Sequence, residues 1–197
     1  MVRLQNDVTG VIIAGGKSER FGSNKALAAV NGVPIVQSIC SQVQLLLSNV
    51  LIISNTPEDY RFLNIPVYKD IVPNKGPIGG LHTALELSFS PWVFVTPCDL
   101  PLFSFNGILA LARETESTEV VCFSRENKLE PFPAIFNKTL VPKLLTFLKA
   151  KNYAMQRFLH SCEVTLVPIE SNRDCVAPNI LTNCNTVQDY EKIPHLT

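Results

Sequence analysis

Short apolar runs alternate along the chain with segments of helical periodicity. Residues 9–14, 50–53 and 92–96 are runs of mainly β-branched and aromatic residues, which is typical of strands buried on both faces of a sheet. After Pro34, apolar residues recur at helical spacing, which predicts an amphipathic helix. The other elements that the pattern predicts are strands at 66–68, 119–123, 133–136 and 164–168, and helices at 57–63, 81–87 and 138–150.

This alternation of strands and helices predicts βαβ crossovers and a parallel sheet. We therefore expect an α/β fold, a single Rossmann-like three-layer sandwich with a mostly parallel, twisted sheet between helices. No internal repeat, low-complexity stretch or linker is seen, so residues 1–197 are expected to form one domain. Eight of the nine glycines lie at or before Gly80. Because open α/β sheets bind ligands at the carboxyl ends of their strands, we expect the site in the first half of the chain.

Composition narrows the class of protein. Of 197 residues, 46% are hydrophobic and 17% are charged, which excludes a disordered chain. The chain has 17 basic residues (Lys and Arg) and 17 acidic residues (Asp and Glu), so it lacks the excess of basic residues typical of nucleic-acid-binding proteins. No apolar run is long enough for a membrane span, and the first residues lack a signal-peptide core. The six cysteines form no CxxC pair and are expected to be reduced core thiols of a cytoplasmic protein.

The segment from Ala14 to Lys25 contains the most residues of types that bind phosphates. Gly15 and Gly16 follow the first predicted strand, and without Cβ atoms the backbone can approach a ligand and turn its N–H groups toward phosphates. Arg20 and Lys25 add cations suited to a triphosphate. The spacing matches neither the P-loop pattern GxxxxGK followed by Ser or Thr nor the dinucleotide-binding pattern GxGxxG.

Acidic residues follow two other predicted strands. Asp99 lies between two prolines after the run at 92–96. Mg²⁺ is typically held by one or two carboxylates plus substrate phosphates, so Asp99 is the candidate metal ligand, with a turn-capping role as the structural alternative. Asp70 follows the run at 66–68 and is either a second site residue or an ordinary turn residue. The loop that ends at Gly80 contains further glycines and could lie flat against a ligand.

Polar residues of the second half are candidates for binding a second substrate. Arg157 stands in a predicted short helix and would suit an anionic group, although a solvated arginine is the structural alternative. Asn183 and Asn185 follow the apolar pair Ile180–Leu181, which we interpret as the end of a strand that faces the cleft. An amide side chain can both donate and accept hydrogen bonds. Alternatively, one of the two asparagines caps a helix that begins at Thr186.

A strand followed by AGG-x3-R-x-G-x2-K resembles the signature of the nucleotidyltransferases that make activated sugars and cofactors. Within that group the chain is most similar to the molybdenum cofactor guanylyltransferases. Further segments match in the same order and extend the resemblance over essentially the whole chain: Asp70 with Gly76-Pro-Ile-Gly-Gly-Leu81, Pro97-Cys-Asp-Leu-Pro101, and Asn183-Cys-Asn-Thr186 with Asp189-Tyr190.

The resemblance implies GMP transfer from GTP to Mo-molybdopterin, with Mg²⁺ as cofactor and pyrophosphate as product. It implies a nucleotide-binding half at about 8–101 and an acceptor-binding half at about 102–197. Molybdoenzymes or their chaperones are further candidate partners, and neither nucleic acid nor a membrane is expected. The implied nucleotide contacts are Ile13, Ala14, Gly15, Gly16, Lys25, Asn55, Asp70, Gly76, Pro77, Gly80 and Asp99. The implied catalytic residues are Arg20, Lys25 and Asp99, with Asp99 as metal ligand, and the acceptor residues are Arg157, Asn183 and Asn185.

Departures from the family pattern keep alternatives open. Phe21 replaces the usual Met, Thr186-Val-Gln-Asp189 stands where Thr-Pro-Glu-Asp is more common, and Glu130 stands where relatives often carry His. The last change leaves the pterin contacts open. A cytidylyltransferase of the same superfamily usually has Ala-Ala-Gly in the first loop, and a sugar-1-phosphate nucleotidyltransferase usually has GxGTR. The retained Lys25 and Asp99 argue against a third alternative, an inactive homologue that serves as a binding module.

Overall fold

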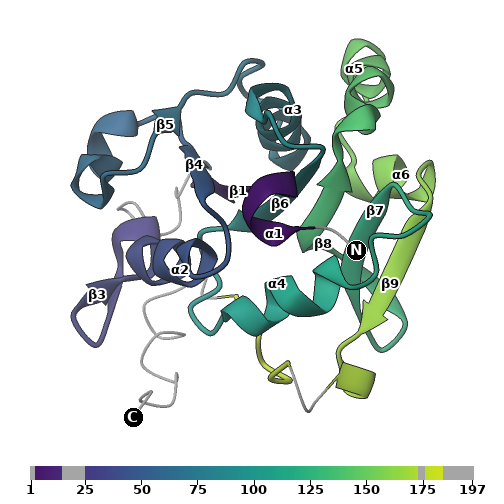
Figure 1. Cartoon of the computed structure of the whole chain (residues 1–197). Coiled ribbons are helices and arrows are strands. Elements are labelled where there is room, and N and C mark those ends of the chain that lie inside the picture. The colour runs from purple at the N-terminus through teal and green to yellow at the C-terminus, as the bar shows by residue number, and fades with distance from the viewer. Residues whose placement is uncertain (1–2, 15–24, 173–175, 184–197) are drawn as a thin grey trace.

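The computed structural model describes residues 3–14, 25–172 and 176–183. These residues form a seven-stranded sheet in the order β5-β4-β1-β6-β8-β7-β9, with helices on both faces, and a separate two-stranded hairpin of β2 and β3 (Figure 1). The strands are β1 Val8–Ile13, β2 Ala29–Val30, β3 Val33–Pro34, β4 Asn49–Ile53, β5 Val67–Tyr68, β6 Trp92–Pro97, β7 Val120–Arg125, β8 Lys128–Asn137 and β9 Val164–Pro168. The α-helices are α1 Leu4–Asp7, α2 Ile35–Gln44, α3 Pro77–Leu87, α4 Phe105–Ala112, α5 Val141–Lys149 and α6 Met155–His160. The 3-10 helices are η1 Lys25–Leu27, η2 Pro57–Leu63, η3 Lys138–Leu140 and η4 Glu170–Asn172.

The sheet is mostly parallel, as the alternation of strands and helices predicts. Strand β1 pairs in parallel with β4 on one side and with β6 on the other, and β4 pairs in parallel with β5. Strand β8 pairs antiparallel with both β6 and β7, whereas β7 and β9 pair in parallel. In the sheet that the structure describes, β8 therefore runs against the other six strands.

Two hydrophobic cores lie on opposite faces of this sheet. Helices α2 and α4 cover one face together with Val8 and Ile12 of β1, and α3, α5 and α6 cover the other face together with Val11 (Figure 1). Successive residues of β1 thus enter different cores, which is why the strand is an uninterrupted apolar run rather than an alternating one. The result is the expected three-layer sandwich. No helix in the described ranges is long and apolar enough to cross a membrane.

Gly10 lets α2 lie close against β1. A Cβ atom at this position would be 2.5 Å from Cγ1 of Val43 and 3.1 Å from Cδ1 of Leu47. The apolar spacing after Pro34 (Ile35, Ile39, Val43, Leu46) predicts that Leu46 is on the buried face, but Leu46 is only partly buried and Leu47 is buried instead. The helical spacing does not extend this far because α2 ends at Gln44.

Helix α3 begins earlier than the sequence predicted. The expected start was residue 81, after a glycine-containing loop, but the helix begins at Pro77. Gly76 adopts a positive φ of 62° at the N-cap, a conformation that costs glycine little, and Pro77 occupies the first turn, where its missing N–H leaves no hydrogen bond unmade. The glycines at 79 and 80 therefore belong to a helix rather than a loop.

The second half departs more from expectation. Helix α4 was not predicted, because Gly107 interrupts its apolar pattern. A Cβ atom at Gly107 would be 2.9 Å from Cδ1 of Ile180, so any other residue there would make the Ile180 side chain shift. Strand β8 begins at residue 128 rather than 133, because Glu126 and Asn127 turn the chain with positive φ values of 51° and 62° and pair β8 with β7. Ile180–Leu181 lies in a turn, so the interpretation of this pair as the end of a strand was wrong.

Candidate functional site

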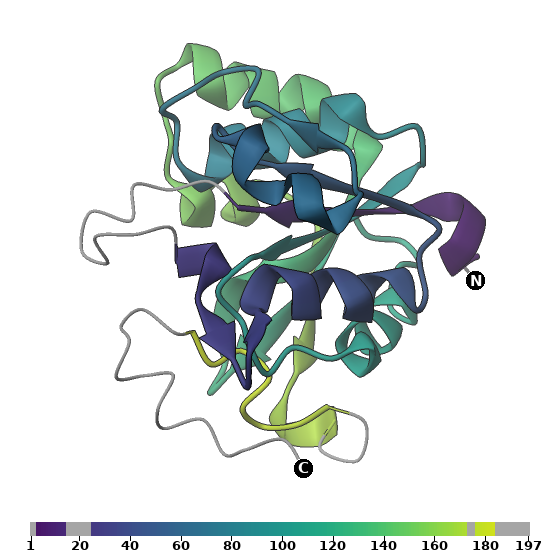
Figure 2. The ribbon, with the colours of Figure 1, turned by 90° about the vertical axis from the view of Figure 1, so that its left-hand side faces the viewer.

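Four neighbouring parallel strands end at the same edge of the sheet. In Figure 2, the purple strand β1 runs from α1 across the molecule. Ala14 is the residue that directly follows this strand. Asn55, Asp70 and Asp99 follow the ends of β4, β5 and β6 within two residues. Because these strands are parallel and adjacent, the fold brings four of the sequence-predicted site residues to one edge.

Backbone hydrogen bonds fix the end of β1 between its neighbours. The Ala14 N–H donates to the Ile53 carbonyl at 2.8 Å, and the Cys98 N–H donates to the Ile13 carbonyl at 3.2 Å. The hydroxyl of the fully buried Tyr60 donates to the Ala14 carbonyl at 3.1 Å. The point at which the chain leaves β1 is therefore held by three separate elements.

The first turns of α3 lie against the same point. A Cβ atom on Gly80 would be 2.9 Å from Cδ1 of Ile13, so the absence of a side chain at Gly80 sets how closely α3 approaches β1. Gly76 and Pro77 are exposed at the helix N-terminus, where unpaired N–H groups and the helix dipole favour negative charge. Thr83 ties this helix to the loop after Asp70, because its hydroxyl oxygen accepts from the Ile71 N–H at 3.0 Å.

Asn55 and Asp70 form a reciprocal pair across the ends of β4 and β5. The Asn55 side-chain Nδ2 donates to Oδ2 of Asp70 at 3.1 Å, and the Asp70 N–H donates to Oδ1 of Asn55 at 3.3 Å. Burial raises the pKa of Asp70, and the hydrogen bond from Asn55 partly opposes that shift. The second carboxylate oxygen, Oδ1, is buried and has no hydrogen-bond partner among the described residues. The pair therefore leaves one oriented acceptor oxygen for a ligand.

Asp99 is held in a buried turn after β6. Its relative exposure is 9%, and the flanking Cys98 and Leu100 are exposed by 6% and 1%. The Phe103 N–H donates to the Leu100 carbonyl at 3.1 Å, and the Phe103 ring stacks on Phe94 with centroids 5.6 Å apart. The described residues contain no group of three or more His, Cys, Asp or Glu side chains that could hold a metal. A single buried carboxylate fits a cation that takes most of its ligands from substrate phosphates and water.

Several sequence-predicted residues cannot be placed. Gly15, Gly16, Arg20 and Asn185 lie outside the described residues. Lys25 opens η1, but its side chain is outside what the structure describes.

The acceptor candidates lie on segments that reach the same region. The Lys75 ammonium lies 4.6 Å from the centroid of the Tyr153 ring, which joins the loop before α3 to the segment before α6. Arg157 is exposed on α6. Asn183 is also exposed, two residues after the buried Leu181. Because Ile180 packs against Gly107 near Phe103, the segment with Asn183 lies near the turn that carries Asp99.

Sequence reasoning missed the contacts that join these residues. Nothing in the spacing of Asn55 and Asp70 indicates that they bind one another, and Lys75 and Tyr153 are far apart in the chain. The sequence contained one weak indication of the turn at Glu126 and Asn127, because Asn adopts a positive φ more readily than most residues.

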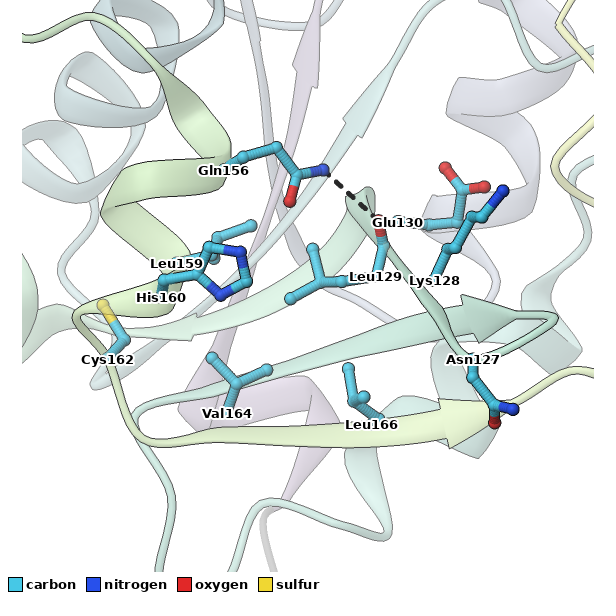
Figure 3. Close-up of a pocket in the computed structure, with 10 residues that line it drawn as sticks. All are labelled: Asn127, Lys128, Leu129, Glu130, Gln156, Leu159, His160, Cys162, Val164 and Leu166. Carbon is cyan, nitrogen blue, oxygen red and sulfur yellow. Dashed lines mark hydrogen bonds between the residues drawn. The ribbon is translucent and has the colours of Figure 1, made fainter.

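An open groove of about 720 Å³ lies between α6 and strands β8 and β9 (Figure 3). Its floor is apolar and its rim is polar, with Gln156 donating to the Leu129 carbonyl at 3.4 Å. Its lining includes neither Asp99 nor the end of β1. The lining residues are Asn127, Lys128, Leu129, Glu130, Gln156, Leu159, His160, Cys162, Val164 and Leu166.

Comparison with known proteins gives consistent results. Residues 10–165 match the family model described as the MobA-like NTP transferase domain. A Carboxydothermus hydrogenoformans protein named "Probable molybdenum cofactor guanylyltransferase" is 35% identical over 191 residues, which cover 96% of each chain. The molybdenum cofactor guanylyltransferase of Syntrophotalea carbinolica is 32% identical over 188 residues, covering 93% of this chain and 89% of the other. The fold also matches the crystal structure of molybdopterin-guanine dinucleotide biosynthesis protein A from Archaeoglobus fulgidus, with a TM-score of 0.80, 17% identity, and 93% and 95% of the two chains covered.

Proposed function

Since the chain belongs to the MobA-like NTP transferase family, we propose that it transfers GMP from GTP to Mo-molybdopterin, with pyrophosphate as the second product. The observation that carries the proposal is the convergence of Ala14, the Asn55–Asp70 pair, the N-terminus of α3 and the buried Asp99 at one edge of the sheet. The guanylyl rather than cytidylyl assignment rests on the Ala14-Gly15-Gly16 loop and on the names of the full-length relatives.

The reaction is a phosphoryl substitution that needs alignment and charge neutralisation more than a covalent intermediate. The terminal phosphate of molybdopterin attacks the α-phosphorus of GTP in line, a new P–O bond forms, and the bond to the β-phosphate oxygen breaks. The phosphate nucleophile is already ionised at neutral pH, so no general base is required. The amides of Gly15 and Gly16, with Arg20 and Lys25, stabilise the charge that develops on the departing pyrophosphate.

Asp99 is the residue that would hold Mg²⁺, because it is the buried carboxylate at the end of β6. A bound Mg²⁺ would neutralise charge on the phosphate groups. Asp70 presents its buried Oδ1 to a donor on the nucleotide, a sugar hydroxyl or a base N–H, and Asn55 holds it in that orientation. Gly76, Pro77 and Gly80 shape the N-terminus of α3 so that it can approach the nucleotide.

The acceptor is bound by the second half of the chain. Arg157 contributes an exposed cation on α6, and Asn183 contributes an amide near the turn of Asp99. Asn185 is assigned the same role from its sequence motif. An amide suits a pterin edge because that edge carries both donors and acceptors.

The decisive experiment incubates the protein with each of the four NTPs and Mg²⁺, with and without Mo-molybdopterin, and measures pyrophosphate and dinucleotide. We expect pyrophosphate release that depends on the presence of the acceptor. We also expect a preference for GTP over CTP of roughly 10⁴-fold or more, as for sites that hydrogen-bond one base edge. Equal use of CTP would overturn the guanylyl assignment. Turnover with a sugar 1-phosphate in place of molybdopterin would favour the sugar nucleotidyltransferase, and no turnover with any NTP would favour an inactive binding module.

A further inference from the structure

Residues 69–76 connect β5 to α3, with Asp70 near one end of the segment and the N-terminus of α3 at the other (Figure 1). Both ends belong to the part of the sheet edge that the proposed function assigns to the nucleotide. The segment is described throughout and contains neither a helix nor a strand. Its conformation therefore depends on the hydrogen bonds and contacts that it makes with neighbouring elements.

Two consecutive backbone N–H groups anchor the start of this segment to two different elements. The Asp70 N–H donates to Oδ1 of Asn55 at 3.3 Å, and the Ile71 N–H donates to the hydroxyl oxygen of Thr83 at 3.0 Å. Asn55 follows β4, whereas Thr83 lies in the second turn of α3. These N–H groups belong to the two peptide planes that flank the Cα atom of Asp70. With both planes anchored, the direction in which the Asp70 side chain leaves the backbone is fixed.

The Thr83 hydroxyl is oriented to accept from Ile71 because its own proton is used elsewhere. It donates to the Gly79 carbonyl, four residues earlier in α3, at 3.1 Å. Thr83 is 0% exposed, so water does not compete for either hydrogen bond. One buried hydroxyl therefore joins the first turn of α3 to the backbone that orients Asp70.

The same segment packs directly on the first turn of α3. A Cβ atom on Gly79 would be 3.0 Å from the Val72 carbonyl oxygen and 3.0 Å from Cβ of Lys75. The segment lies this close because Gly79 has no side chain, and the carbonyl of the same glycine accepts from Thr83. The segment and the first turn of α3 are thus held together at the point where Thr83 connects them.

The orientation of Asp70 matters because one of its two carboxylate oxygens already has a partner. Oδ2 accepts from Asn55 at 3.1 Å, and Oδ1 is buried with no hydrogen-bond partner among the described residues. A hydrogen bond to a charged oxygen requires good alignment of donor and acceptor. A rotation of the Asp70 backbone would therefore turn Oδ1 away from a donor on the nucleotide, although the carboxylate kept its charge.

We propose that Thr83 is a positioning residue for GTP binding, which holds the backbone of Asp70 so that Oδ1 meets its donor on the nucleotide. This inference rests on the proposed function. The Thr83 hydroxyl itself is not available to the nucleotide, because it is buried and its proton is donated to Gly79. Since Thr83 acts through Asp70, its loss should weaken GTP binding and leave the chemical step at Asp99 unchanged.

The test compares Thr83→Val and Thr83→Ser with the wild-type protein in steady-state GMP transfer at saturating Mo-molybdopterin, with equilibrium GTP binding and a melting curve for each. Thr83→Val keeps the shape of the side chain and removes both hydrogen bonds. We expect its KM and Kd for GTP to rise roughly three- to tenfold, as for the loss of a hydrogen bond, with kcat unchanged. Thr83→Ser keeps the hydroxyl and should restore the affinity for GTP.

A double-mutant cycle with Asp70→Asn separates positioning from a general effect on the fold. Asp70→Asn should raise the Kd for GTP at least as much as Thr83→Val does, because it removes the charge of the acceptor group itself. Thr83→Val should then add little in the Asp70→Asn background, since the residue through which it acts is already impaired. Fully additive effects would show that Thr83 supports GTP binding by another route and would overturn the inference.

Thr146→Val is the matched control. Thr146 is exposed on α5 and makes the same kind of hydrogen bond, from its hydroxyl to the Pro142 carbonyl four residues earlier, at 3.0 Å. This variant should keep the wild-type kcat and GTP affinity. The inference also fails if Thr83→Val binds GTP normally, if it lowers kcat along with GTP affinity, or if Thr83→Ser does not restore binding. If the wild-type protein transfers no GMP to molybdopterin, the proposed function itself fails, a result that is distinct from any effect of the variants.

Discussion

The two halves of the sheet edge are built in different ways. On the proposed nucleotide side, β5, β4, β1 and β6 run in parallel, and each ends within two residues of a candidate site residue. On the proposed acceptor side lie the antiparallel hairpin of β7 and β8 and the described segment at 176–183, which contains no strand. Backbone hydrogen bonds between adjacent strand ends fix the candidate residues of the first half, whereas side-chain packing, such as that of Ile180 against Gly107, fixes the segment of the second half.

This difference is consistent with separate roles for the two sides, phosphate binding on one and acceptor recognition on the other. Phosphates of any NTP have the same geometry, so a rigid edge of strand ends and a helix N-terminus can serve them. The proposed acceptor side would have to recognise one particular molecule, and a hairpin with a register shift between Cys122 and Ser124 can vary without disturbing the sheet. We therefore expect substitutions on the two sides to separate GTP binding and catalysis from acceptor binding.

The largest expected effect is that of Asp99→Asn, which keeps the shape of the side chain and removes its charge. If this carboxylate holds the metal, kcat should fall by roughly 100-fold or more, while the melting temperature changes little. Steady-state GMP transfer at saturating Mg²⁺ measures the effect, and chelation of the metal should lower wild-type activity in the same way. Glu58→Gln, an exposed charge loss on η2, should have no effect. Near-full activity of Asp99→Asn would point to Asp70 as the principal ligand.

A smaller effect, on stability alone, is expected for Gly10→Ala. The added Cβ would be 2.5 Å from Cγ1 of Val43, and a valine side chain cannot move aside without leaving its rotamer. The free energy of unfolding should fall by about 1–3 kcal/mol, as for other overpacked cores, and urea denaturation measures it. Val43→Ala combined with Gly10→Ala should recover part of the loss. If the double variant is less stable than the sum of the single changes predicts, steric overlap is not the cause.

The smallest effect is expected at the opposite edge of the acceptor half. Lys143 donates to Glu119 at 2.7 Å and to the Ser161 carbonyl at 3.1 Å, and the Glu163 N–H donates to Glu119 at 2.9 Å. The hydrogen bond from Lys143 lowers the pKa of Glu119 below its ordinary 4.5, and burial partly opposes that shift.

Because the pKa of Glu119 is lowered by folding, its stabilisation is present above pH 4.5 and lost as the pH falls through the folded-state value. Glu119→Gln should cost about 0.5–1 kcal/mol at pH 7, small because the Lys143 and Glu119 side chains are 33% and 28% exposed, and less at pH 3. Denaturation at both pH values measures the difference. Activity at pH 7 should stay unchanged, and a loss of acceptor affinity would break the separation between this edge and the site.

The chain's local pattern determined the nucleotide side well. Buried strands read as apolar runs because both faces of the sheet are covered, and Pro97 and the glycines mark where the strands end. Ile13, Ala14, Asp70 and Asp99 could therefore be assigned to one edge from sequence, since parallel strands place their carboxyl ends together. The start of α3 was misplaced because glycine and proline are typical of loops as well as of helix N-termini.

Only the tertiary structure decided the acceptor side. The approach of Ile180 to Gly107 and the contact of Lys75 with Tyr153 both join residues from separate elements. Helix α4 and the first half of β8 were missed for the same reason, because a partner element rather than local periodicity stabilises them. Local pattern reports which face of an element is buried, whereas pairing and packing between distant segments depend on the free energy of the whole fold.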